Sequence, residues 1–419
     1  MTGLAVLAGV YVFYSLVAAR LERWSITAPM VFVVAGALIG PEGLGIFEVA
    51  TNTEAVTLVT ELTLSIILFA DASTLRWRDV RLDALLPSRL LLIGFPLTVL
   101  AGAVAAGWLA PELGWAAAAL VGSILAPTDA ALGLGVFSDR SVPARVRRAL
   151  NIESGLNDGL ATPLVAVFLA IIVAEAGADQ GHWVAEAFKE LGVAIVVAVL
   201  VGTVLGRLVV AARRRQWTSE TSDRLAVLAT ALLAYAGSVT VGGNGFVAAF
   251  AAGILFAAAS RGELAEATTF TEDAGLFLSF FVWTLFGAAL VAPLVTSAIH
   301  PAAVFYAVLS LTVVRMVPVA IALIGTGLRP SSLAFMGWFG PRGLASVVFT
   351  LIAFESLHQG GTAPDLLIEV AAWTILLSIL THGVTARPLA AWYGRNVADG
   401  AAENLSPPQD LEEPSPRRL

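Results

Sequence analysis

The stretch ALNIESGLNDG at residues 149–159 lies in an otherwise apolar run and carries two carboxylates, Glu153 and Asp158, beside the amide of Asn157. An ionisable side chain inside hydrocarbon costs about 2.5 to 3.5 kcal/mol even on lenient insertion scales. Such groups persist where they pair, line a water-filled cavity or bind an ion. The stretch therefore predicts an ion or proton site on a membrane helix.

The composition of the whole chain indicates a membrane protein. Of its 419 residues, 58% are hydrophobic and 13% are charged, against roughly 25% charged residues in soluble domains. The mean hydropathy is +0.85. Apolar runs long enough to cross a bilayer recur to about residue 390, and we predict about 13 spans. They are placed at about residues 2–19, 28–41, 55–73, 90–110, 114–137, 149–174, 186–210, 224–241, 244–259, 273–294, 301–325, 331–355 and 365–388.

Several function classes are excluded by residue content. The chain has no cysteine, which rules out thiolate chemistry, disulfides and iron–sulfur clusters. Its four histidines, His182, His300, His358 and His382, show no metal-ligand spacing. The net charge of −7 indicates no nucleic-acid partner. We therefore expect no cofactor and no enzymatic activity.

The basic residues predict the orientation. Cytoplasmic loops carry an excess of arginine and lysine, and alternate loops here hold nearly all of them. This rule places the N-terminus outside and the C-terminus in the cytoplasm, with the first apolar run kept as a span. One side holds Arg20, Arg23, Arg76, Arg78, Arg81, Arg89, Arg140, Arg145, Arg147, Arg148, Arg213, Arg214, Arg215, Arg224, Arg261, Arg329, Arg387 and Arg395; the other holds Lys189.

Two predicted spans contain a proline beside polar groups. The fifth carries GSILAPTDA at residues 122–130 and the twelfth carries GWFGPRG at residues 337–343. A proline removes a helical hydrogen bond, and paired broken helices mark the substrate site of inverted-repeat transporters. The pattern predicts spans 1–6 and 8–13 as repeats around a linking seventh. Asp129 would then offset exposed helix N-termini and Arg342 exposed C-termini; the alternative is a simple kink in packed helices.

Side-chain spacing along the sixth span favours a cation site. Ser154 and Asp158 lie four residues apart and share one helical face. Asp158 and Asp129 each lie roughly 12 to 13 Å from the cytoplasmic end, so we expect them to meet. Oxygen ligands suit Na⁺ or K⁺, and Asp158, Ser154 and Thr128 supply them. A proton and a metal ion would compete for Asp158.

These motifs together resemble a known family. Thr128-Asp129, Glu153-Ser154-x-x-Asn157-Asp158-Gly159, Phe280-Phe281-x-x-x-Leu285-Phe286-Gly287-Ala288 and Gly340-Pro341-Arg342-Gly343 are similar in order and spacing to the monovalent cation:proton antiporter-1 family of bacterial NhaP type. The resemblance covers about residues 1–390. It implies an all-α polytopic membrane protein in which two broken helices cross.

The resemblance also implies residue roles. The cation and proton would bind at Asp158, with Asn157, Ser154, Thr128 and Asp129 around it. A structural ion pair would join Glu153 to Arg315, and Arg342 would balance charge. Asp71 would be either on the ion path or a simple interfacial carboxylate. Apart from the resemblance, we expect Glu61 and Glu369 to serve in packing or dimer contacts.

The expected activity is exchange of Na⁺, Li⁺ or K⁺ for H⁺ by alternating access in a bacterial plasma membrane. A single titrating carboxylate at the site, with an asparagine beside it, predicts one proton per cation and therefore electroneutral exchange. A transmembrane domain at residues 1–395 would contain a core (about 90–175 and 300–390) and a scaffold (about 1–75 and 224–294) that forms a homodimer, with a disordered cytoplasmic tail at 396–419. Partners are the monovalent cation and membrane lipid. A Na⁺-coupled solute symporter and a K⁺/H⁺-selective antiporter remain alternatives.

Overall fold

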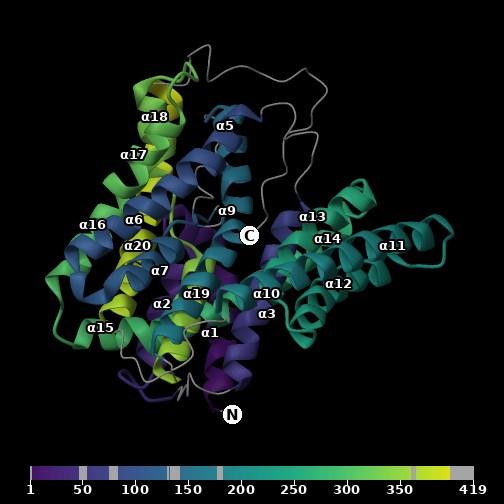
Figure 1. The fold of residues 1–419 in the computed structure, drawn as a ribbon, viewed down its shortest axis with the longest axis horizontal. Helices are drawn as coiled ribbons and strands as arrows, with labels where there is room; N and C mark the ends of the chain where they lie inside the picture. Colours follow the sequence, from purple (N-terminus) through teal and green to yellow (C-terminus); the bar gives the residue numbers. More distant parts are fainter. Residues whose placement is uncertain are drawn as a thin grey trace. The chain divides into compact units, whose positions relative to one another are not determined.

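The described part of the chain is helical throughout. The computed structural model describes residues 2–46, 54–74, 84–129, 132, 142–176, 183–359 and 365–396, and no strand occurs among them (Figure 1). Arg76, Arg78, Arg81, Arg140 and His182 lie outside the described residues. So does the predicted tail, apart from Asn396.

Eight helices in the described residues are long and apolar enough to cross a membrane, and four shorter apolar helices accompany them. The predicted all-α polytopic architecture is therefore confirmed. Every predicted span overlaps a helix, but the number of crossings and the inverted repeat stay predictions. The eight run over Thr2–Arg23, Glu54–Ser73, Leu85–Leu109, Ala144–Ala174, Ala185–Arg214, Ala265–Thr296, Pro301–Ala322 and Asp365–Asn396.

The chain divides into two compact units, one of which combines residues 1–51, 82–157 and 280–419. π-helical turns at Leu90–Gly94 and Gly287–Val291 join its helices without a loop. Its helices are α1 (Thr2–Arg23), α2 (Ala28–Ile39), α5 (Leu85–Arg89), α6 (Phe95–Leu109), α7 (Gly114–Leu125), the first part of α9 (Ala144–Ala176), the end of α14 (Ala265–Phe286), α15 (Ala292–Thr296), α16 (Pro301–Leu311), α17 (Val313–Ala322), α18 (Pro330–Trp338), α19 (Leu344–Gln359) and α20 (Asp365–Asn396).

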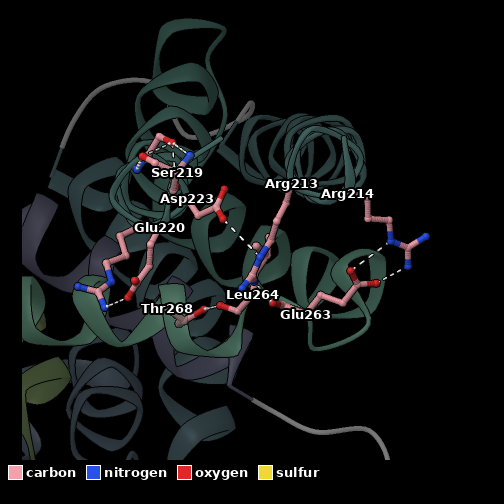
Figure 2. Close-up of polar contacts among 10 residues, drawn as sticks. Arg213, Arg214, Ser219, Glu220, Asp223, Glu263, Leu264 and Thr268 are labelled. Atoms are coloured by element: carbon pink, nitrogen blue, oxygen red, sulfur yellow. Dashed lines mark hydrogen bonds and ion pairs between the residues drawn. The ribbon is translucent and has the colours of Figure 1, made fainter. Parts of the chain in front are cut away.

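The other unit comprises residues 52–81 and 158–279. Besides the remainder of α9 and most of α14, it holds α3 (Glu54–Ser73), α10 (Trp183–Ala198), α11 (Val204–Arg214), α12 (Glu220–Thr240) and α13 (Gly245–Ser260). Charged side chains join α11 to α12 and to the turn between α13 and α14: Arg214 of α11 pairs with Glu263 of that turn, and Arg213 Nε lies 3.5 Å from Asp223 of α12 (Figure 2). The predicted core and scaffold are a separate division and stay a prediction.

Both predicted interruptions are present in the first unit. Helix α18 ends at Trp338 and α19 begins at Leu344, so residues 339–343 are non-helical. Helix α7 ends at Leu125, and residues 126–129 are likewise non-helical. Helix α7 packs closely on α6, because a Cβ on Gly122 would strike the Val99 carbonyl. Small residues permit such backbone contact in membrane helices, and here the contact lies one turn before the first break.

Candidate functional site

A cluster of hydroxyl and amide groups joins α9 to the break after α7. Asn157 Nδ2 donates to Thr128 Oγ1 over 2.8 Å, and Thr128 Oγ1 lies 3.0 Å from Ser154 Oγ. All three side chains are buried, with exposed fractions of 0%, 1% and 6% respectively. Helix α9 supplies Ser154 and Asn157 from adjoining turns, whereas Thr128 comes from the non-helical segment. The structure thus brings together three of the predicted oxygen donors.

One oxygen of this cluster has no hydrogen-bond donor among the described residues. Asn157 Oδ1 is buried and accepts no hydrogen bond from the described residues. A buried acceptor without a donor costs roughly 1 to 3 kcal/mol, so native proteins rarely leave one. An amide oxygen beside two hydroxyl oxygens suits a hard monovalent cation. The unpartnered atom therefore fits a site that a cation or water completes.

Asp158 follows Asn157 directly in α9. The helix runs unbroken across this point, and its spacing puts Asp158 one turn after Ser154 on the same helical face. The aspartate is 8% exposed, and its carbonyl accepts a hydrogen bond from Thr162 Oγ1. Asp158 is the first residue of the second unit. The expected meeting of Asp158 with Asp129 stays a prediction.

Glu153 and Arg315 form a bidentate ion pair in the interior. Arg315 Nη1 and Nη2 donate to the two carboxylate oxygens over 2.6 and 2.9 Å, and the side chains are 1% and 2% exposed. The Arg315 guanidinium lies against Gly340, where a Cβ would overlap Arg315 Nε and approach Thr128. The pair that the resemblance implied is thus present. It links α9, α17 and the break between α18 and α19.

Asp129 connects the two breaks. Its backbone N–H donates to the Pro341 carbonyl over 2.8 Å, and its carboxylate accepts from the N–H of Leu344 over 3.2 Å. Leu344 is the first residue of α19, so the carboxylate caps the positive end of the other broken helix. A Cβ on Gly343 would collide with the Asp129 side chain. The second glycine of the Gly-Pro-Arg-Gly motif is therefore required by this close approach.

Arg342 contacts carbonyl groups at the C-terminal ends of helices, whereas Asp129 caps an N-terminal end. Its Nη1 donates to the Ala126 carbonyl at the end of α7, over 3.1 Å, and its Nη2 donates to the Ser310 carbonyl of α16, over 3.2 Å. The side chain is fully buried. Carbonyls at a helix C-terminus lack intrahelical partners and carry partial negative charge. The arginine therefore supplies donors where the broken chain leaves acceptors.

Three further polar side chains at the breaks were missed by the sequence reasoning. Ser346 Oγ of α19 donates to the Ile124 carbonyl over 2.7 Å, and Ser378 Oγ of α20 accepts from the Arg342 N–H over 2.7 Å. His382, one turn after Ser378, contacts the Trp338 carbonyl through Nε2 over 2.8 Å. The only sequence signal was a serine and a histidine four residues apart in an apolar helix.

The remaining predicted carboxylates lie elsewhere. Asp71 is a partly buried residue near the end of α3, in the second unit. In that unit Glu61 accepts from Tyr235 Oη over 2.6 Å. Glu369 of α20 pairs with His300 at the start of α16, and the carboxylate also accepts the His300 N–H over 2.9 Å. These contacts agree with packing roles, while the role of Asp71 stays a prediction.

Two of the basic residues attributed to a loop are in fact buried. Arg145 and Arg147 lie in the first turn of α9 with exposed fractions of 6% and 9%. Arg147 Nε donates to the Val142 carbonyl over 3.0 Å. Their charges therefore lie inside the protein at the start of the helix that carries the site.

Residues 7–392 match the family model described as the transmembrane sodium/hydrogen exchanger. Among similar curated proteins, the K⁺/H⁺ antiporter NhaP of Alkalimonas amylolytica is 26% identical over 410 residues, which cover 96% of this chain and 69% of that protein. The K⁺/H⁺ antiporter NhaP2 of Shewanella sp. strain ANA-3 is 27% identical over 401 residues, covering 91% of this chain and 64% of that protein. The chain thus spans about two thirds of these relatives.

A solved structure shares the fold. The sodium proton antiporter MjNhaP1 of Methanocaldococcus jannaschii, determined at pH 8, superimposes with a TM-score of 0.77 at 23% identity. The match covers 93% of this chain and 98% of that one. At this identity the likeness establishes the fold alone.

Proposed function

The chain belongs to the sodium/hydrogen exchanger family, and we propose that it exchanges a monovalent cation for a proton at a site built from Asp158, Asn157, Ser154 and Thr128. The observation that carries the proposal is the unpartnered, buried Asn157 Oδ1 beside two hydroxyl oxygens. Asp158, one residue further along α9, supplies the carboxylate on which a proton and the cation compete.

The proposed stoichiometry is one proton per cation. Asp129 is already engaged with the backbone of Pro341, within the second break, and of Leu344, at the start of α19, through its N–H and its carboxylate. Glu153 is neutralised by Arg315. We propose that Asp158 alone exchanges its proton, so each cycle moves no net charge. Transport that an imposed membrane potential leaves unchanged would support this assignment, and voltage-dependent current would refute it.

The identity of the cation has two candidates. The resemblance implied Na⁺, with Li⁺ or K⁺ as further substrates, whereas the two named relatives are K⁺/H⁺ antiporters. Hydroxyl, amide and carboxylate oxygens suit all of these hard cations. The transported cation is therefore identified by measuring proton release with each cation in turn.

The proposed setting is a bacterial inner membrane, with the N-terminus outside, the C-terminus in the cytoplasm and alternating access within a homodimer. Support comes from the arginine distribution for the orientation and from the bacterial relatives for the membrane. The predicted 13 spans and inverted repeat belong to the same proposal. Each predicted crossing overlaps a helix, and the two interruptions fall in the fifth and twelfth.

The test is cation-evoked proton release from proteoliposomes loaded with a pH-sensitive dye. Na⁺, Li⁺ and K⁺ are added separately to the native chain, to Asp158→Asn and to the matched control Asp365→Asn, which alters an exposed residue at the start of α20. We expect exchange in the native protein and the control, and loss of it in Asp158→Asn. A native protein without any cation-evoked pH change, or an active Asp158→Asn, would overturn the proposal.

A further inference from the structure

The break between α18 and α19 has two backbone groups that a single neighbouring helix contacts. The Trp338 carbonyl, at the end of α18, accepts the Gly340 N–H over 2.8 Å, and the Arg342 N–H lies just before α19. An unsatisfied backbone group inside a membrane costs several kcal/mol. From α20, His382 Nε2 lies 2.8 Å from the Trp338 carbonyl oxygen, and Ser378 Oγ accepts the Arg342 N–H over 2.7 Å.

The two α20 side chains also contact each other. Ser378 Oγ lies 3.2 Å from His382 Nδ1, as expected for residues four apart on one helical face. Both side chains are buried, at 0% and 1% exposure. The imidazole ring stacks on the Trp338 indole with centroids 5.0 Å apart, and the indole Nε1 donates to Thr385 Oγ1 over 3.0 Å. These contacts fix the position of the His382 imidazole ring.

The contacts of the His382 ring constrain one of its two ring nitrogens. A carbonyl oxygen can only accept, so His382 Nε2 must carry a hydrogen toward Trp338. His382 Nδ1 lies 2.9 Å from the Ser378 carbonyl oxygen and 3.2 Å from the Ser378 hydroxyl oxygen, so it either donates to the carbonyl or accepts the hydroxyl hydrogen. Ser378 Oγ in turn accepts from Arg342. Both arrangements keep the Nε2 donor toward Trp338.

We propose that His382 is a positioning residue which, together with Ser378, clamps the α18–α19 break from α20 and thereby holds Arg342 against the end of α7. The hydrogen bonds run from the Arg342 N–H through Ser378 and His382 to the Trp338 carbonyl, so both ends of the clamp lie on the same non-helical segment. Arg342 reaches the Ala126 carbonyl from that segment. The inference rests on the proposed function for its effect on transport, but the clamp itself does not.

The clamp is tested first without transport. Backbone hydrogen exchange of residues 339–344 is measured in the native protein, in Ser378→Ala and in His382→Leu. The matched control is Thr381→Val, since the Thr381 hydroxyl bonds only the Leu377 carbonyl of its own helix. We expect exchange about five- to tenfold faster in the first two variants, from the loss of one hydrogen bond, and unchanged in the control. Unchanged exchange in all variants would overturn the clamp.

The proton arrangement has its own signature. Nitrogen NMR of histidine-labelled protein, with the His382 signals identified by their loss in His382→Gln, should show a ring that carries a hydrogen on Nε2. A ring protonated on Nδ1 alone would contradict the assignment, because the Trp338 carbonyl would then face a bare nitrogen. This readout is also independent of transport.

Transport then tests the positioning role. Glutamine at position 382 retains an N–H donor that can reach the Trp338 carbonyl, whereas leucine does not. We expect the maximal exchange rate to fall at least about tenfold in His382→Leu and to recover to within about twofold in His382→Gln. Equal rates in both variants would refute the role. If the native chain does not exchange cations, the proposed function fails, while hydrogen exchange and NMR still decide on the clamp.

Discussion

The buried Glu153–Arg315 pair yields a quantitative prediction about what holds the site together. Each partner is at most 2% exposed, and two hydrogen bonds join them. Removing one partner leaves a buried charge without compensation, which costs about 3 to 5 kcal/mol. We expect Glu153→Leu and Arg315→Met each to lower the free energy of unfolding by that amount. This is a large share of the roughly 5 to 15 kcal/mol that stabilises a typical protein.

The double variant separates a structural pair from an ion ligand. Replacing both charges by apolar side chains of similar size is often neutral or stabilising. The double variant should therefore lose less than about 2 kcal/mol, whereas two independent losses would add to roughly 6 to 10 kcal/mol. If the pair is purely structural, the double variant also regains cation-evoked proton release.

The assay is reversible denaturant unfolding of the purified protein in detergent, followed by circular dichroism, with exchange measured in proteoliposomes alongside. A Glu153→Leu variant as stable as the native chain would refute the energetic argument. A double variant that loses as much as the sum of the single variants would refute the coupling. A stable double variant without exchange would show that the pair takes a direct part in transport.

Two further changes give distinct outcomes. Gly343→Ala should lower the free energy of unfolding by about 1 to 3 kcal/mol and weaken exchange, because the added Cβ collides with Asp129. Gly192→Ala, whose Cβ meets open space within α10, should instead raise the free energy of unfolding by up to about 1 kcal/mol. Coinciding melting curves of the two variants would contradict this prediction. At the Arg214–Glu263 pair, the hydrogen bond from Arg214 lowers the pKa of the Glu263 carboxyl below its usual 4.5. The ionised carboxylate therefore stabilises the folded state above the unfolded-state pKa, and this stabilisation is lost as the pH falls through the lower folded-state pKa. Melting temperatures of Glu263→Gln and the native chain should therefore converge in acid and differ at neutral pH, and an equal difference at both would refute the linkage.

The sequence alone determined that the chain is a helical membrane protein and where polar groups interrupt its apolar spans. Hydropathy is a local property, and the bilayer leaves a helix as the simplest way to satisfy each backbone group. The prolines at positions 127 and 341 marked the two breaks for the same local reason. Helical spacing placed Ser154 and Asp158 on one face, and the motif order indicated the family.

Tertiary structure decided which breaks and charges meet. That Asp129 caps α19, Arg342 reaches Ala126, and His382 clamps Trp338 depends on helices far apart in sequence. The sequence predicted which kind of helix end Asp129 and Arg342 would offset, but the partner of each side chain follows from packing geometry, which spacing along a single helix does not give. The glycines of the Gly-Pro-Arg-Gly motif acquire their reason only there, because no Cβ fits beside Arg315 and Asp129 once the two broken segments pack together.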